Sequence, residues 1–300
     1  MPLPDWPHTG VSWADGRASL CFTSPEGTDA HVPLQLGERV SWRLPGVRRC
    51  IGVWIPNLGR RVGCPNQRVL PTARTAAQCD PCERTDPGKA LARGQALDDP
   101  REFRLYLAYF GPGLVKVGLT ALERGTNRLT EQAALAYTWL ATGPLRPIRR
   151  AELAASATKI ATERLRHRTK ARGRWHPSYA AGTELAEAHR RLAPIVAGAG
   201  ELTVEDLKVT DLRDTYGLTG AGRPEREVTD IEYDACLTGV LRCLAGRDAV
   251  LDTDGGTLLV DLRLLAGRTI ADGGGAPLDG VDVSLLDLGR APAPEQDTLF

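Results

Sequence analysis

The sequence predicts an α+β fold, in which a central α+β unit lies between two modules of short strands. Two short apolar runs at residues 103–110 and 114–119 flank a Gly-Pro-Gly turn at 111–113, a combination typical of a tight hairpin. Apolar residues then recur at helical spacing over residues 149–170, so we expect one long helix with a buried face. On both sides of this unit, alternating apolar and polar runs with turn signals predict strands.

Residues 1–99 are expected to form the first module. Residues 17–22 and 40–44 alternate apolar and polar side chains, as in a small antiparallel meander. From Cys64 to about Asp99 the chain is rich in Pro, Arg, Asp and Gly and has no periodicity. We therefore predict a loop region that needs an anchor.

Residues 100–200 are expected to form the central unit, with the order ββαβα. After the hairpin come a helix-like stretch at 121–134, a strand at 136–141 and the long helix. A further helical pattern covers residues 183–196. Tyr106 and Tyr109 lie on the first strand with a difference of three positions, so they point to opposite faces; we expect Tyr106 to line a site and Tyr109 to pack.

Residues 201–290 are expected to form a small all-β module, because glycines separate short alternating runs from about residue 230 to residue 288. Residues 291–300 begin with alternating Ala and Pro and end in Leu-Phe. This composition predicts a flexible tail with an apolar tip.

The overall composition excludes several classes of protein. The 300 residues include 38 Lys plus Arg and 37 Asp plus Glu, a net charge of +1, and 42% are hydrophobic. These values argue against a disordered chain and against an overall basic nucleic-acid coat. No run approaches the roughly 18 apolar residues of a membrane span, and the first residues lack a secretory signal. We therefore expect a cytoplasmic protein without membrane contact.

The charge is nevertheless segregated along the chain. Residues 143–176 carry a net charge of +8, whereas residues 201–300 carry −11. A basic helix is often only a solvated face, but arginine also binds phosphate oxygens bidentately. The basic segment therefore predicts contact with DNA or RNA. The residues that we expect to make this contact are Arg146, Arg149, Arg150, Arg164, Arg168, Lys170 and Arg172.

Four of the seven cysteines, Cys50, Cys64, Cys79 and Cys82, lie close together in the sequence, and the last two form a Cys-x-x-Cys pair. Four thiolates suit tetrahedral zinc and leave no position for water, so we expect a structural zinc site that anchors the loop. A redox Cys-x-x-Cys pair and unliganded core thiols are the alternatives. The other three cysteines lie in apolar runs and are expected to be buried thiols.

The central unit resembles the GIY-YIG nucleases. The resemblance rests on the runs Leu-Tyr-Leu-Ala-Tyr-Phe at 105–110 and Val-Lys-Val-Gly-Leu-Thr at 115–120, on an arginine that opens a helix, and on a glutamate in a later helix. It implies a metal-dependent phosphodiesterase, with Mg or Mn held by the glutamate. The implied catalytic residues are Tyr106, Lys116, Arg128 and Glu152, with Arg124 as the alternative arginine and Glu152 as the ligand of the divalent cation.

The chain also resembles, nearly from end to end, a bacterial family called domain of unknown function 2797. This second resemblance covers the cysteines, the central unit and the glycine-rich region at 239–267. The expected fold is thus a GIY-YIG-like ββαβα unit between an N-terminal β module with a zinc loop and a C-terminal small all-β module.

The sequence departs from the nuclease pattern at two points. Lys116 stands where the second tyrosine of the pattern is expected, so the usual base is replaced or missing. Glu163 competes with Glu152 as the metal ligand. If both lie on one helix, eleven residues apart, they are about 16 Å apart and cannot share one ion.

The tail ends in Gln-Asp-Thr-Leu-Phe, which resembles the peptide that docks bacterial DNA-processing proteins on the replication sliding clamp. That resemblance implies that Gln296, Leu299 and Phe300 bind the clamp. The leading expectation is therefore a phosphodiesterase in DNA repair or processing. The alternatives are a catalytically degenerate nucleic-acid-binding or scaffold protein that docks on the clamp, and a small-molecule enzyme on a reused fold.

Overall fold

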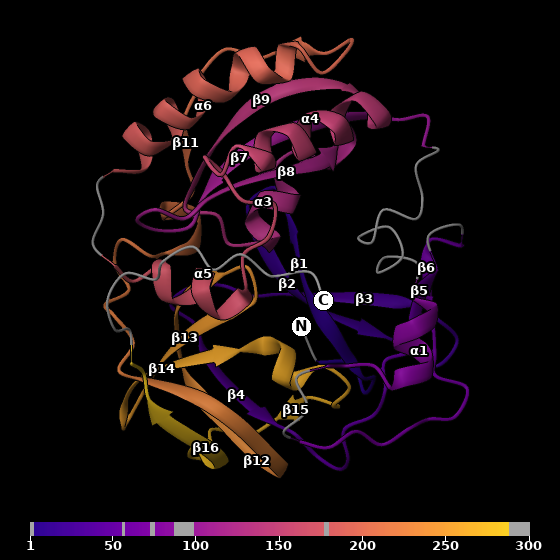
Figure 1. Ribbon diagram of the computed structural model, residues 1–300. Helices are drawn as coiled ribbons and strands as arrows, with labels where there is room; N and C mark the ends of the chain where they lie inside the picture. Colours follow the sequence, from indigo (N-terminus) through magenta and orange to yellow (C-terminus); the bar gives the residue numbers. More distant parts are fainter. Residues whose placement is uncertain (1–2, 56–57, 73–75, 87–98, 177–179, 288–300) are drawn as a thin grey trace. The chain divides into compact units, whose positions relative to one another are not determined.

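The computed structural model describes residues 3–55, 58–72, 76–86, 99–176 and 180–287 (Figure 1). It contains two compact units, one from residues 1–96 and 216–286 and the other mainly from residues 97–215. The sequence predicts residues 1–99 and 201–290 as separate modules, whereas the structure joins most of both in one unit. The two units are described in turn.

A three-stranded antiparallel sheet opens the first unit and contains the predicted strand at 17–22, whereas the predicted strand at 40–44 joins a different sheet. The three-stranded sheet has the order β1-β2-β3. A two-residue turn, Asp15-Gly16, joins β1 to β2, and both residues have positive φ, as this kind of hairpin requires. The strands are β1 (His8–Ala14), β2 (Arg17–Thr23) and β3 (Asp29–Pro33).

The second sheet of this unit joins the two ends of the sequence. Its order is β13-β14-β12-β4-β15, and β16 also pairs with β12. The 20-residue strand β12 runs antiparallel to β4, from Cys236 opposite Arg43 to Val240 opposite Arg39. Because of this pairing the N-terminal and C-terminal segments share one sheet. Its strands are β4 (Arg39–Arg43), β12 (Arg226–Ala245), β13 (Asp248–Thr253), β14 (Gly256–Asp261), β15 (Ala271–Asp272) and β16 (Asp279–Leu285).

A buried arginine fixes the chain that leads to the first cysteine. The Arg48 side chain is fully buried, and its Nε donates to the carbonyl of Ala266 at 2.8 Å. The next residue, Arg49, donates its main-chain N–H to the carbonyl of Gly267 at 2.7 Å. These bonds hold the start of the cysteine segment against the turn after η4 (Leu262–Leu265).

Three short elements then carry the cysteines. They are the antiparallel hairpin β5 (Val53–Ile55) and β6 (Arg60–Val62), and the helix α1 (Asp80–Thr85). Pro81 lies in the first turn of α1, where its missing N–H costs no helical hydrogen bond.

The second unit has the predicted order strand, strand, helix, strand, helix. Its sheet has the order β10-β9-β7-β8, and β11 also pairs with β9. The expected hairpin at 111–113 is confirmed, because β7 and β8 pair from Phe103 opposite Ala121 to Tyr109 opposite Val115. The strands are β7 (Glu102–Tyr109), β8 (Val115–Ala121), β9 (Ala136–Pro144), β10 (Thr203–Val204) and β11 (Thr210–Asp211).

Helices α4 and α6 contact each other and both contact β7, β8 and β9, so they cover one face of this sheet (Figure 1). The fully buried Leu105 and Leu107 of β7 lie on one face, and Tyr106 lies on the other. The helical elements of this unit, in chain order, are η2 (Leu122–Arg124), α3 (Asn127–Glu131), α4 (Leu145–Ala157), α5 (His167–Gly173) and α6 (Ala181–Ala197), followed by η3 (Asp214–Tyr216) at the boundary between the units.

The single helix expected over residues 149–170 is wrong. Helix α4 ends at Ala157, and Lys159 takes a positive φ of 61° that a helix does not allow. The Thr158 hydroxyl donates to the carbonyl of Ala155 and accepts from the N–H of Ile160, which satisfies the helix end locally. The chain then runs beside β8, where Thr162 exchanges main-chain hydrogen bonds with Val115 and Val117, and basic residues continue on α5.

The expected helix at 121–134 is also shorter than predicted. Gly125, with a φ of 49°, separates η2 from α3. Among the described residues, no helix is long and apolar enough to cross a membrane.

Candidate functional site

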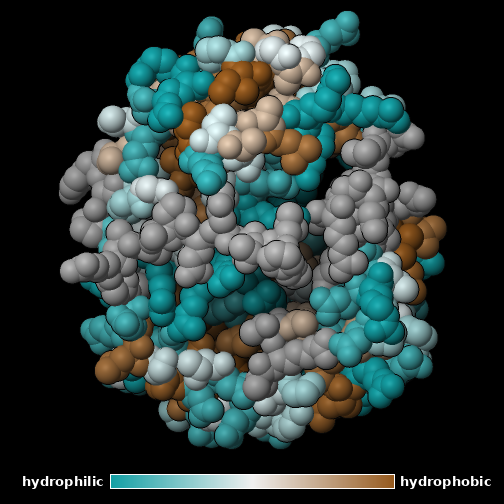
Figure 2. Space-filling view, in the orientation of Figure 1, coloured by the Kyte–Doolittle hydropathy of each residue, from teal (hydrophilic) through white to brown (hydrophobic). Residues whose placement is uncertain are grey.

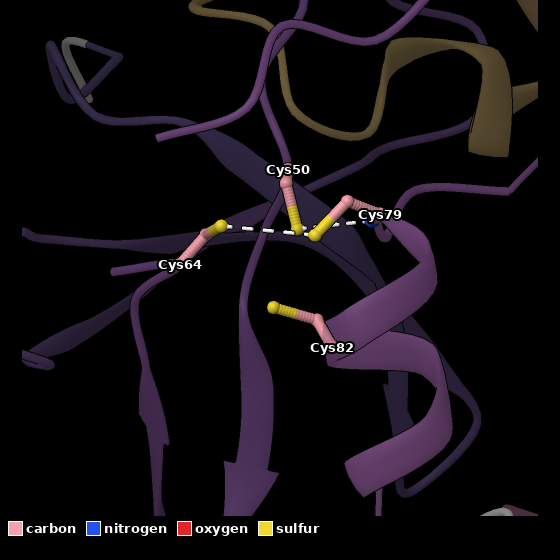
Figure 3. Close-up of side chains that lie close together, drawn as sticks. All are labelled: Cys50, Cys64, Cys79 and Cys82. Atoms are coloured by element: carbon pink, nitrogen blue, oxygen red, sulfur yellow. Dashed lines mark hydrogen bonds between the residues drawn. The ribbon is translucent and has the colours of Figure 1, made fainter. Parts of the chain in front are cut away.

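The four clustered cysteines meet in the first unit (Figure 3). Cys50 precedes β5, Cys64 follows β6, and Cys79 and Cys82 lie at the start of α1. All four are buried, and their sulfur atoms lie within 4.8 Å of one another. The Sγ atoms of Cys64 and Cys79 are 3.8 Å apart. Segments separated by up to 32 positions in sequence thus converge on one point.

This geometry fits a tetrahedral metal ion. With zinc–sulfur bonds of about 2.3 Å, tetrahedral ligands lie about 3.8 Å apart. The main-chain N–H groups of Gly52 and Cys79 donate to the Cys50 sulfur at 3.4 and 3.2 Å, so this sulfur accepts two hydrogen bonds. Four buried cysteines placed in this way could bind a metal such as zinc.

The protein environment shifts the pKa values of these thiols in different directions. Burial raises the pKa of Cys50 and of Cys82. Burial also acts to raise the pKa of Cys64, but the main-chain N–H groups of Arg68 and Asn66 outweigh it and lower this pKa to about 7. Of Cys50, Cys64 and Cys82, Cys64 therefore most readily supplies a thiolate at neutral pH.

The remaining cysteines lie outside this cluster. Cys236 and Cys243 are buried, as predicted, whereas Cys21 is only half-buried.

The second candidate site lies on the β7–β8 hairpin. Tyr106 of β7 is directly opposite Gly118 of β8, and the Lys116 ammonium lies 5.7 Å from the centre of the Tyr106 ring. The Tyr106 hydroxyl accepts a hydrogen bond of 2.7 Å from Nε2 of Gln132, a residue that the sequence analysis did not single out. The Tyr106 and Trp139 rings meet edge to face, 6.4 Å apart. The structure therefore brings Tyr106 and Lys116 together.

Glu152 of α4 is buried, and the charge of Lys116 acts on it. Its carboxylate forms an ion pair with Arg149, one helical turn earlier. The charges of Arg149 and Lys116 act to lower the pKa of Glu152, but burial outweighs them and raises it. Glu152 is thus a buried carboxylate held by a guanidinium.

Glu163 binds the same arginine as Glu152. The predicted large distance between the two glutamates is therefore wrong. The Arg149 Nη1 that binds Glu152 also lies 2.9 Å from a carboxylate oxygen of Glu163. The expected distance of about 16 Å assumed one continuous helix. Because the chain turns after Ala157, Glu163 returns to the side of Glu152.

Arg128 and Arg124 both form ion pairs with a glutamate on the surface. Arg128 is 3.6 Å from Glu131, and Arg124 is 2.6 Å from the same carboxylate. Glu131 was not recognised in the sequence as their partner. The Arg128 side chain is 45% exposed, in contrast to the buried Glu152.

The basic residues of the central unit differ in exposure. Arg146 and Arg150 of α4, Arg164, and Arg168 of α5 are exposed. Arg172 is half-buried, and the Lys170 ammonium lies 4.9 Å from the centre of the Phe110 ring. Arg149 is the member of the predicted set that binds two carboxylates. The tail residues Gln296, Leu299 and Phe300 lie outside the described residues, so the clamp contact stays a prediction.

Fold and site together define the class: an α+β protein with a four-cysteine cluster that could bind a metal. Residues 37–270 match the family model described as "Protein of unknown function (DUF2797)", and the chain belongs to this family. No curated protein and no solved structure matches the chain.

Replacing Gly118 by alanine should disrupt the hairpin site. A Cβ at this position would lie 2.6 Å from Cζ of Tyr106 and 2.9 Å from Nζ of Lys116, so the tyrosine must move. We expect Gly118→Ala to lower the free energy of unfolding by about 1–3 kcal/mol. Urea titration measures this, with Gly182→Ala as the control, because a Cβ there meets open space. Equal stability of both variants would contradict the packing described.

Proposed function

We propose that this protein binds nucleic acid through the exposed arginines of α4 and α5, and that a structural zinc ion in the four-cysteine cluster holds the first unit together. The support for nucleic-acid binding is the +8 charge of residues 143–176 together with the exposure of Arg146, Arg150, Arg164 and Arg168. Exposed guanidinium groups gain affinity for a polyanion by releasing its counterions. For zinc, the support is the sulfur geometry, and the metal would act there as a cross-link without an open position.

The arrangement around Glu152 favours binding over cleavage. Arg149 already pairs with both Glu152 and Glu163, so a divalent cation on Glu152 would compete with this guanidinium. The residues therefore do not fit a Mg or Mn ion in the conformation described. The Lys at position 116 also removes the tyrosine that the nuclease pattern places on the second strand.

Phosphodiester hydrolysis is the second candidate, and one observation favours it. The Lys116 ammonium lies 5.7 Å from the centre of the Tyr106 ring, and its charge acts on the buried Glu152. These are three of the residues to which the GIY-YIG resemblance assigns a catalytic role. In such a site the Tyr106 hydroxyl, oriented by Gln132, would hold or take up a proton, and Lys116 would offset phosphate charge. Cleavage that is lost in Tyr106→Phe would establish this second function.

Reversing two exposed charges should weaken binding. Arg150 and Arg164 are exposed, and we expect Arg150→Glu combined with Arg164→Glu to raise the Kd for DNA or RNA at least about tenfold at low salt. Fluorescence anisotropy with labelled oligonucleotides measures the Kd. The control makes the same charge change at Arg190 and Arg191, which are exposed on α6. An equal loss in both variants would show only an effect of net charge and would contradict a local site.

A further inference from the structure

An apolar pocket lies beside the four-cysteine cluster. It has a volume of about 340 Å³, within the range of small-molecule sites, about 300–1,000 Å³. At the right-hand edge of the molecule, Figure 2 shows apolar side chains in the region where Figure 1 places β5 and β6. The pocket lies between this hairpin and α1, and Cys82 is one of its walls. Its apolar lining is formed mainly by Val53, Ile55, Val62, Pro65 and Pro81.

Exposed arginines without acidic partners lie on the same chain segments as this pocket. Residues 48–86 contain seven arginines, no lysine and three carboxylates. Arg49, Arg60, Arg68 and Arg84 are exposed, and within the described part of the chain none of them forms a salt bridge. Arg60 and Arg49 donate to main-chain carbonyls, those of Glu26 at 3.0 Å and Gln67 at 3.2 Å.

Two of these arginines, Arg60 and Arg84, are adjacent to pocket residues in the fold. Arg60 is directly opposite Ile55 in the β5–β6 pairing, so both side chains lie on the face that forms the pocket. Arg84 precedes Thr85, another pocket residue, in α1. The surface therefore combines an apolar hollow with nearby exposed guanidinium groups that form no salt bridge in the described part of the chain.

We propose that this surface is a second nucleic-acid contact, in which the pocket takes an unpaired base and the arginines bind the flanking phosphates. A base presents a flat apolar face, and the proline rings and aliphatic side chains of the pocket match it. Guanidinium groups bind phosphate oxygens bidentately, which matches the nearby arginines. The inference rests on the proposed nucleic-acid binding and specifies its substrate class: a strand with accessible bases, single-stranded or locally unpaired.

The four cysteines would then have a role in recognition. A metal held by Cys64 and Cys82 would tie β6 to α1, and both elements contribute lining residues to the pocket. A metal in the cluster would set the width of the pocket without touching the nucleic acid.

The test uses the full chain, a fluorescently labelled short oligothymidylate and a duplex of the same length. We expect Arg60→Glu combined with Arg68→Glu to raise the Kd for the single strand about tenfold or more. The control combines Arg17→Glu and Arg43→Glu, two exposed arginines of the same unit, and should change the Kd less than threefold. Circular dichroism checks that each variant is folded.

The pocket is tested separately by Val62→Glu. Val62 is 43% exposed, so the strand tolerates a polar residue there, yet the carboxylate would lie in the pocket. We expect weaker binding of the single strand and little change for the duplex. An equal effect on both probes would overturn the base pocket.

The outcomes separate this inference from the proposed function. If the Arg60 and Arg68 variant binds like wild type while the Arg150 and Arg164 variant binds weakly, the second contact is refuted and the proposed function stands. If wild type binds neither probe at low salt, the proposed function fails as well.

Discussion

Serine in place of both Cys79 and Cys82 is expected to remove the metal and to unfold the segment between β5 and α1. Two of the four metal ligands would be lost. The segment is held by a small cluster of six buried residues, and four of the six are the clustered cysteines. We expect the metal content to fall from about one zinc per chain to none. Elemental analysis of the purified protein measures the metal. Hydrogen exchange at residues 50–86 reports the local unfolding.

The matched control is Cys21→Ser, because Cys21 lies in the same unit but outside the cluster. It should leave the metal content unchanged. A double variant that keeps its metal, or a wild-type protein that contains none after purification without chelators, would contradict the zinc site.

Removing the Glu152 carboxylate is expected to have the second large effect, on the free energy of unfolding. In Glu152→Ala, Arg149 keeps only Glu163 in a half-buried position, so we expect a loss of about 2 kcal/mol in the free energy of unfolding. Urea titration measures this loss. The control is Glu187→Ala, which breaks another Arg–Glu pair three residues apart on a helix, but at an exposed position, and should cost about 0.5 kcal/mol or less. Equal losses would contradict the burial of Glu152.

The same carboxylate gives a pH dependence of known sign. Because burial raises the pKa of Glu152 in the folded state, the folded protein holds this proton more tightly than the unfolded chain. The part of the stability that depends on this proton is therefore complete below about pH 4.5, the ordinary pKa of Glu152, and is lost as the pH rises through the raised value. Relative to Glu152→Gln, wild type should lose stability from pH 4.5 upward. A constant difference between the two proteins across this range would contradict the raised pKa.

Local patterns were enough to predict much of the second unit. The Gly-Pro-Gly turn and the short apolar runs predicted the β7–β8 hairpin, because a hairpin depends on adjacent residues. Helical periodicity predicted α6 over 183–196, and the structure has Ala181–Ala197. The spacing of the four cysteines predicted their cluster, because few arrangements other than a metal site bring buried thiols together.

Contacts between distant segments were not predictable in this way. The pairing of β4 with β12 joins residues about 200 positions apart, and strand alternation carries no information about its partner. Glu163 was misplaced because the periodicity of residues 149–170 continues across the break at Thr158 and Lys159. The partner of Arg128 and Arg124, Glu131, depends on the turn at Gly125 and on side-chain geometry that the sequence pattern does not show.

The central claim is that exposed arginines of this protein bind nucleic acid, and the salt dependence of binding tests it most directly. Wild-type protein should bind labelled single-stranded DNA or RNA at low salt, and log K should fall linearly with log salt concentration with a slope of about −2 or steeper, reflecting several phosphate contacts. The Arg150 and Arg164 variant should show a shallower slope. Absence of binding to both nucleic acids at low salt, or binding that does not change with salt, would contradict the account.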